Sequence, residues 1–269
     1  MKILSINEIQ SMLLDLMKKV HTFLEENGIA YYMLGGSTLG AIRHGGFIPW
    51  DDDIDIGMLR DDYEKFLKVC HNFDSEYAIV NFKNAKNCDF ALTRIYINNT
   101  MIDDKSVAKT KLDKRLYFDI FPLDIVPESE EERRAFEKKI IKKKKSLGYM
   151  YARNYENSSA EMFIKNMIAA FYAPFRGHIL KSCDKLMTKY QNIDSSYVCS
   201  LCSQYSFKKQ VMPKVYYGTP VLHKFEDSEF YIPEQTHKYL STLFGEDYME
   251  IPPEDKRRKG HDIYLLDKE

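Results

Sequence analysis

Apolar residues in the first part of the chain follow a helical period. They recur every three or four positions over residues 6–26, which predicts an amphipathic helix. Ser5 and Glu8 have the spacing of a capping box at its start, and Gly28 is suited to end it. The same period predicts further helices over 38–44, 60–69, 128–150, 160–190 with a break at Pro174, and 237–245.

Shorter apolar runs with many β-branched and aromatic side chains predict strands. These runs cover residues 29–34, 52–58, 77–82, 90–97 and 116–126. Strands and helices mix in the first part of the chain, which predicts an α/β (α+β) fold with a mixed sheet and flanking helices. We divide the chain into a core over 1–127, a mainly helical insertion over 128–215, and a C-terminal segment over 216–269 that folds back onto the core.

Charge and composition exclude several classes of protein. Lys and Arg number 39 and Asp and Glu 40, so the net charge of −1 leaves no overall basic field for nucleic acid. The N-terminal stretch spreads its charges and has no cleavage site of small residues, so we do not expect a signal peptide. No apolar run approaches the roughly 20 residues of a membrane span.

The five cysteines are an odd number, and only Cys199 and Cys202 are close in sequence. This CxxC pair has no second pair and no neighbouring histidines, which argues against a zinc site. We therefore expect buried, reduced thiols in a cytoplasmic protein.

The most unusual stretch is IPWDDDIDIGM, residues 48–58, where aspartates interrupt apolar residues. Asp53 and Asp55 stand two apart on a predicted strand, so their carboxylates point to the same side. The interleaved isoleucines predict a half-buried strand and not a solvated acidic turn. Converging carboxylates are ligands that Mg²⁺ prefers, which predicts a magnesium site. Asp51 falls on the same side, whereas Asp52 points away and is expected to meet water or a cation such as Arg43.

A further carboxylate, Asp119, stands alone among apolar residues of the predicted strand 116–126. An unpaired buried charge is costly, so we expect Asp119 to be paired or to act at the site. Asp124, which follows Pro122, is interpreted as a residue that ends or turns this strand.

Gly35, Gly36 and Ser37 lie between a predicted strand and a predicted helix. Glycines let backbone N–H groups approach an anion, and a helix start favours negative charge. Ser37 is suited both to cap the helix and to donate to a phosphate. The spacing fits neither a Walker A loop nor GxGxxG, and such glycines are common in ordinary loops, so both interpretations stay open.

Four basic residues are candidates for contacting a phosphate. Arg43 and His44 end the predicted short helix, and Arg43 is as well suited to a salt bridge with the acidic run. Arg94, among apolar strand residues, is either a phosphate clamp or half of a buried ion pair. His261 is either a phosphate-binding or base residue or an exposed tail histidine.

Residues 35–66 read GGSTLGAIRHGGFIPWDDDIDIGMLRDDYEKF, and this stretch resembles the LicD family of phosphotransferases, which also includes fukutin-related sugar-phosphate transferases. Residues 117–124, YFDIFPLD, are similar to the family's later acidic strand, and residues 244–261 to its C-terminal motif. The resemblance implies a nucleotidyltransferase fold. The chain departs from the usual family residues at Thr38, Gly45 and Phe244.

The resemblance implies transfer of a phospho-alcohol from a CDP-linked donor to a sugar hydroxyl, with release of CMP. For bacterial members it implies phosphocholine from CDP-choline and a teichoic acid or lipopolysaccharide acceptor. Asp53, Asp55 and Asp119 would hold one or two Mg²⁺ ions, with Asp119 as an alternative proton acceptor, and Gly36 and Ser37 would cradle a donor phosphate. Transfer of NMP to a small molecule such as an aminoglycoside, and a non-catalytic glycan-binding protein, are the other interpretations.

The insertion over 128–215 matches no motif and is expected on the acceptor side. It contains a basic run over 138–145 and the apolar stretch MFIKNMIAAFYAPF over 162–175. The basic run is most simply a solvated helix face. If the acceptor is carried on a lipid, the two stretches would suit peripheral attachment to the inner face of the cell membrane. Choline's quaternary ammonium favours an aromatic cage, and Trp50 adjoins the aspartates.

Overall fold

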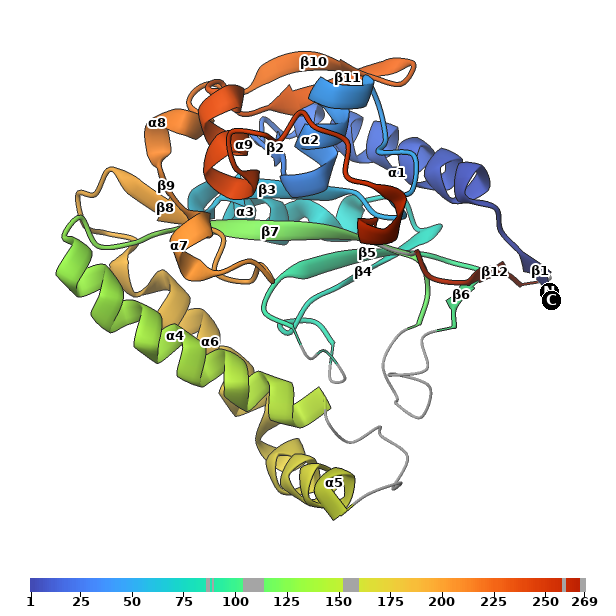
Figure 1. Cartoon of the computed structure of the whole chain (residues 1–269). Coiled ribbons are helices and arrows are strands. Elements are labelled where there is room, and N and C mark those ends of the chain that lie inside the picture. Colours follow the sequence, from blue (N-terminus) through green and yellow to red (C-terminus); the bar gives the residue numbers. More distant parts are fainter. Residues whose placement is uncertain (86–87, 89, 104–113, 152–159, 258–259, 267–269) are drawn as a thin grey trace.

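A mixed sheet forms the centre of the molecule (Figure 1). The computed structural model describes residues 1–85, 88, 90–103, 114–151, 160–257 and 260–266. Strands follow the order β2–β3–β7–β5–β4, and they comprise Tyr32–Met33, Asp55–Leu59, Tyr117–Ile125, Thr93–Ile97 and Tyr77–Val80. β3 and β7 run parallel, and the other neighbouring pairs in this order run antiparallel. The predicted mixed α/β class is confirmed.

Further strands extend the structure at its edges. The end of β7 pairs with β8 (Tyr197–Cys199), which pairs with β9 (Val211–Pro213). A small antiparallel sheet joins β1 (Lys2–Ile3), β12 (Ile263–Leu265) and β6 (Thr100–Ile102). β10 (Val221–Phe225) and β11 (Ser228–Ile232) form a hairpin.

Helices cover both faces of the sheet. They are α1 (Ile6–Glu26), α2 (Gly35–His44), α3 (Arg60–Val69), α4 (Glu130–Tyr151), α5 (Ala160–Tyr172), α6 (Arg176–Met187), α7 (Phe207–Gln210), α8 (Lys214–Tyr217) and α9 (Thr236–Phe244). Short 3₁₀ turns span Cys70–Asn72, Ala173–Phe175, Thr188–Tyr190 and Glu254–Lys256. Figure 1 shows α4, α5 and α6 on one side of the sheet and α2 and α9 on the other.

Neighbouring residues of one strand belong to different apolar clusters, which lie on opposite faces of the sheet. Met33 and Ile56 pack with α1 and α3 on one face of the sheet, whereas Tyr32 packs with α9 on the opposite face. Because side chains alternate along a strand, Asp55 and Asp119 point to the face of Tyr32 and α9. A third cluster lies between α4, α6 and β8 and includes Cys183 and Cys199. All five cysteines are free, and burial raises the pKa of Cys183 to about 11.

The predicted first helix is confirmed at both ends. α1 begins after Ser5, and Ser5 and Glu8 make the reciprocal hydrogen bonds of a capping box. α3, α4 and α9 begin within two residues of the predicted positions, and a 3₁₀ turn interrupts the helical region at Pro174.

Elements around the acidic run differ from prediction. β2 has two residues, β3 begins at Asp55 and not at residue 52, and α2 begins at Gly35 and not at residue 38. The helix starts early because the Leu34 carbonyl accepts the N–H groups of Ser37 and Thr38 at 3.0 and 3.3 Å. Leu34 is therefore the N-cap, and the prediction that Ser37 caps this helix was wrong.

A buried ion pair joins the sheet to the helical insertion. Arg60 Nε and Nη2 donate to the two carboxylate oxygens of Asp124 at 2.6 and 3.0 Å, and Nη1 lies 3.2 Å from Asp184 of α6. Arg60 and Asp124 are 2% and 0% exposed. Burial raises the pKa of Asp124, and Arg60 opposes that shift. The interpretation of Asp124 as a strand terminator was wrong, because it lies within β7 and fixes α3 against it.

Replacing Arg60 by alanine should lower the free energy of unfolding by about 3–5 kcal/mol, because the Asp124 carboxylate would stay buried without its partner. The matched control is Lys65→Ala, which removes an exposed pair with Asp62 and should cost less than about 1 kcal/mol. Urea unfolding followed by circular dichroism measures both variants. Similar losses in the two would contradict a special role for the buried pair.

Candidate active site

Neighbouring strands carry three charged side chains in one row. The parallel pairing of β3 with β7 sets Asp55 opposite Asp119, and the antiparallel pairing of β5 with β7 sets Arg94 opposite Asp119. Neighbouring strands lie about 4.8 Å apart, so the row is compact. Carboxylates identified in two separate stretches of sequence are therefore adjacent in the fold.

Arg94 holds the Asp119 carboxylate. Its Nε donates to Oδ1 of Asp119 at 2.8 Å, and its Nη2 lies 3.5 Å from Oδ2. The guanidinium carbon lies 4.0 Å from the ring centre of Tyr117 and 4.4 Å from that of Phe90. Stacking between two rings fixes the plane of the guanidinium and hence its carboxylate partner. The structure shows Arg94 in a part-buried ion pair, with its side chain 24% exposed, and a phosphate contact by Arg94 stays a prediction.

Asp55 lies in the most crowded part of the row. Burial raises the pKa of its carboxyl well above the ordinary 3.8, and the nearby charges of Asp53, Asp119 and Asp51 raise it further. Burial also raises the pKa of Asp119, and Arg94 opposes that shift. Such a group of carboxylates is stabilised by a proton or by an additional cation.

The acidic run lies immediately before β3. Carboxylate oxygens of Asp51, Asp52 and Asp53 all lie within 4.8 Å of one another. Asp53 precedes the strand and does not lie in it, yet Ile54 is fully buried, so the predicted alternation of buried and exposed residues is present.

An all-oxygen donor set is therefore available for Mg²⁺. Hard divalent cations prefer carboxylate oxygens, and the pairing of β3 with β7 sets Asp55 beside Asp119. The carboxylate oxygens of these aspartates are suitable ligands for Mg²⁺. Binding by Asp53, Asp55 and Asp119 stays a prediction, and the carboxylates of Asp51 and Asp52 lie close to that of Asp53.

The first turn of α2 packs against these aspartates. The backbone N–H of Asp55 donates to Ser37 Oγ at 2.9 Å, which ties α2 to the start of β3. A side-chain carbon on Gly36 would lie 2.8 Å from Oδ2 of Asp51. Only glycine at this position leaves the Asp51 carboxylate undisturbed.

The Gly35 N–H group serves the fold. Gly35 has a φ of +52°, and its N–H donates to the hydroxyl of Tyr239 at 2.8 Å. The Ser37 N–H is also bonded within the protein, to Leu34. These two N–H groups are therefore not directed at a ligand. A phosphate contact through Gly36 and the Ser37 hydroxyl stays a prediction.

Arg43 and His44 end α2 beneath the C-terminal segment. Arg43 Nη1 donates to the carbonyl oxygens of Tyr248 and Glu250, both at 2.9 Å, and its Nε donates to His44 Nε2 at 3.0 Å. Burial lowers the pKa of both side chains, and the Arg43 charge lowers that of His44 further. The described contacts of Arg43 are thus with backbone carbonyls and His44, in place of the phosphate or aspartate that the sequence suggested.

The C-terminal segment closes onto the acidic run. The backbone N–H of His261 donates to Oδ2 of Asp52 at 2.7 Å, and its ring Nδ1 lies 3.0 Å from the same oxygen. Arg257 lies 4.4 Å from the ring centre of Trp50. Asp52 was expected to meet Arg43 or water, but it is 6% exposed and meets His261. His261 is accordingly placed beside the site and is not a free tail residue.

Two residues position the site in ways that sequence reasoning did not predict. Tyr239 anchors Gly35 from α9, and the helical period that places it on a buried face was the only signal for it. Glu226 lies in the β10–β11 turn with a φ of +55°, and its carboxylate accepts the N–H of Phe47 at 2.9 Å. No local sequence pattern pairs positions 47 and 226, because the contact depends on the tertiary fold.

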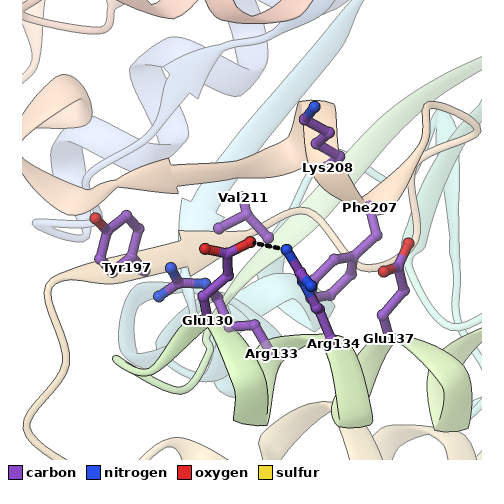
Figure 2. A pocket seen from close by; sticks show the side chains of 8 residues that line it. All are labelled: Glu130, Arg133, Arg134, Glu137, Tyr197, Phe207, Lys208 and Val211. Atoms are coloured by element: carbon purple, nitrogen blue, oxygen red, sulfur yellow. Dashed lines mark hydrogen bonds and ion pairs between the residues drawn. The ribbon is translucent and has the colours of Figure 1, made fainter.

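A separate pocket of about 360 Å³ lies between α4 and the α7–β9 segment (Figure 2). Arg133 stacks 4.1 Å from the ring centre of Tyr197, and Arg134 is paired with Glu130. Tyr197 pairs next to the C-terminal end of β7, about 20 Å along the strand from Asp119. The pocket is therefore distinct from the row of carboxylates.

Comparison with known proteins agrees with this arrangement. Residues 28–156 match the family described as the LicD/FKTN/FKRP nucleotidyltransferase domain. Residues 28–156 form a LicD-family domain. This LicD-family domain contains the predicted carboxylates and Arg94, whereas His261 lies beyond it.

Relatives of known name are transferases. The lipopolysaccharide cholinephosphotransferase LicD of Haemophilus influenzae is 29% identical over 276 residues, which cover 99% of this chain and 100% of the relative. Human ribitol 5-phosphate transferase FKRP is 54% identical over 39 residues, which are 14% of this chain and 8% of FKRP. An uncharacterized protein of Rickettsia prowazekii is 32% identical over 41% of this chain and 44% of its own length. The protein described here is thus an enzyme of the transferase class.

Asp55→Asn should raise the melting temperature in buffer that contains EDTA. The raised pKa means that the folded state binds the Asp55 proton more tightly than the unfolded chain, so stability is lost as the pH rises above about 4. The introduced amide does not ionise, so this loss of stability does not occur in the variant. The increase in melting temperature over the wild type should therefore be larger at pH 7 than at pH 4. Thermal unfolding measures it, with the exposed Asp15→Asn as control. A lower melting temperature for Asp55→Asn at pH 7 would contradict the prediction.

Proposed function

We propose that this enzyme transfers phosphocholine from CDP-choline to a sugar hydroxyl of a cell-surface glycan precursor, a lipopolysaccharide or a teichoic acid, and releases CMP. The alignment of 99% of the chain with a lipopolysaccharide cholinephosphotransferase carries this proposal. The name of the FKRP relative, a ribitol 5-phosphate transferase, supports phospho-alcohol transfer as the general reaction. The free cysteines are in keeping with the cytoplasmic location that we propose.

The proposed reaction is a displacement at phosphorus. The sugar oxygen forms a bond to the phosphorus that carries choline, and the bond from that phosphorus to the CMP oxygen breaks. Negative charge develops on CMP, and the sugar hydroxyl loses its proton to a base. Mg²⁺ would neutralise charge on the diphosphate and on the leaving group.

We assign the ion to Asp53, Asp55 and Asp119. Arg94 orients Asp119 and favours its ionised form, which suits this carboxylate to cation binding more than to holding a proton. Ser37, whose hydroxyl lies at the start of β3, is proposed to contact a donor phosphate together with Gly36.

Trp50 is proposed to meet the choline end of the donor. Quaternary ammonium groups bind over aromatic rings, and Trp50 adjoins the acidic run. Arg257 lies over this ring, so the ring already has a cation as its neighbour. Donor binding would then exchange the guanidinium for the ammonium.

A second candidate function is nucleotidyl transfer. The matched family model is described as a nucleotidyltransferase domain, and that chemistry would attach NMP to a small molecule such as an aminoglycoside. The two reactions differ in their products, because phosphocholine transfer releases CMP and nucleotidyl transfer releases pyrophosphate.

The purified protein with Mg²⁺ should release CMP from CDP-choline when a glycan acceptor is added. Parallel reactions with CDP-ethanolamine, CDP-glycerol and CDP-ribitol test the choice of alcohol, and reactions with nucleoside triphosphates test the second candidate. Chromatography of nucleotides and a pyrophosphate assay measure the products. Pyrophosphate without CMP would overturn the proposal in favour of nucleotidyl transfer.

Asp53→Ala, Asp55→Ala and Asp119→Ala should each reduce CMP release by about 10²-fold or more, because each removes a proposed ligand of the ion. Asp15→Ala, on the exposed side of α1, is the matched control and should retain full activity. Circular dichroism checks that the folds match. Wild-type CMP release by Asp53→Ala or Asp55→Ala would disprove the proposed metal site.

A further inference from the structure

An apolar stripe on α5 is exposed to solvent. Phe163, Ile164 and Met167 are 55%, 55% and 57% exposed, Phe171 is 68% exposed, and Phe175, in the following 3₁₀ turn, is 53% exposed. Their spacing places them on one side of the helix. We call these five residues the α5 stripe.

The α5 helix has apolar composition but no core of its own. Charged or amide side chains occur in it only at Glu161, Lys165 and Asn166. None of its described residues belongs to a buried apolar cluster, whereas α4 and α6 bury Phe136 and Leu180 in a shared one. Contiguous exposed apolar surface of this kind marks an interaction site.

Exposed lysines lie on α4 and α6, the helices that precede and follow α5. Lys138, Lys142 and Lys145 are exposed and recur at helical spacing along α4. Lys181 and Lys185 are exposed on one face of α6. Both α5 and α6 pack against α4, and Figure 1 shows α5 at the end of α4 that is far from the sheet. The helical insertion therefore carries both exposed apolar and exposed basic side chains.

We propose that the α5 stripe and these lysines form a docking surface for an anionic lipid bilayer. The apolar side chains would enter the boundary between headgroups and acyl chains, and the lysines would stay among the anionic headgroups. α5 has 13 residues, and a span needs about 20. Within the described residues, no helix is long and apolar enough to cross a membrane. The helix would lie along the surface.

Charge favours a bilayer over a second copy of the chain. In a two-fold symmetric pair, the same surface faces itself, so the lysines of α4 and α6 would face their own copies. Like charges oppose such an approach, whereas an anionic surface attracts them. This inference concerns attachment alone and does not depend on the proposed donor or reaction.

Sedimentation with vesicles tests the proposal. The wild-type protein should bind vesicles of phosphatidylcholine with about 30% phosphatidylglycerol, and binding should weaken in about 0.5 M salt or without the anionic lipid. The double variant Phe163→Ser/Phe171→Ser should lose about tenfold in binding. Leu222→Ser, at a 47% exposed position of β10, is the matched control and should bind as the wild type does.

A charge variant gives an independent test. Lys138→Gln/Lys142→Gln/Lys145→Gln should also weaken vesicle binding about tenfold, while retaining the α5 stripe. Melting temperatures and CMP release with a water-soluble acceptor should be unchanged in both variants. Equal binding by the variants and the wild type, or equal binding to neutral vesicles, would overturn the proposal. So would a concentration-dependent dimer that forms in place of vesicle binding and is abolished by Phe163→Ser/Phe171→Ser.

Discussion

The parallel pairing of β3 with β7 is the contact on which the site depends. The other described strand pairs are antiparallel, whereas this one is parallel and places Asp55 beside Asp119. Two carboxylates at this separation repel, and the repulsion increases as water is excluded. The register is nevertheless fixed, because Ile56 and Ile120 are fully buried on the opposite face and a slip by one residue would expose them. Arg94 then offsets part of the charge from the other side of Asp119. The apolar face thus holds the polar face in an arrangement whose negative charge is stabilised by a proton or by an additional cation.

The short stretch 35–52 is fastened by the last part of the chain. Contacts from Gly35 to Tyr239, from Arg43 to Tyr248 and from Asp52 to His261 each join residues 204 to 209 positions apart. Each of them uses a group that the sequence suggested for binding a ligand or a cation. The local motif is therefore as much an attachment point for the C-terminal segment as a binding loop. Residues 35–66 and residues 244–261 both resemble the LicD family, and these contacts explain how two distant stretches contribute to one site.

Local pattern was sufficient to predict some elements and not others. The period of apolar residues located α1 with its capping box, and the interleaved isoleucines predicted that Ile54 and Ile56 are buried between less buried aspartates. Asp119 was expected to be paired or to act at the site, and its ion pair with Arg94 shows that it is paired. The start of α2 was misplaced because the hydrogen bonds to the Leu34 carbonyl, and not residue preference, decide it. The partners of Arg43, Asp52 and Asp124 were beyond sequence reasoning, because each depends on how distant elements pack.

The bridge from Arg60 to Asp124 and Asp184 has a consequence for how the molecule opens. It links α3, β7 and α6 through one guanidinium that is 2% exposed. Separating α6 from the sheet would take Asp184 away from Arg60 and expose the buried Arg60–Asp124 pair to water, so a partial opening at this point is unfavourable. The insertion and the strand that carries Asp119 therefore belong to one cooperative unit, in which amide hydrogens of α6 and β7 exchange through a shared opening. Mechanical stress on the helical end of the molecule is then transmitted to the sheet and is not absorbed at a hinge between them.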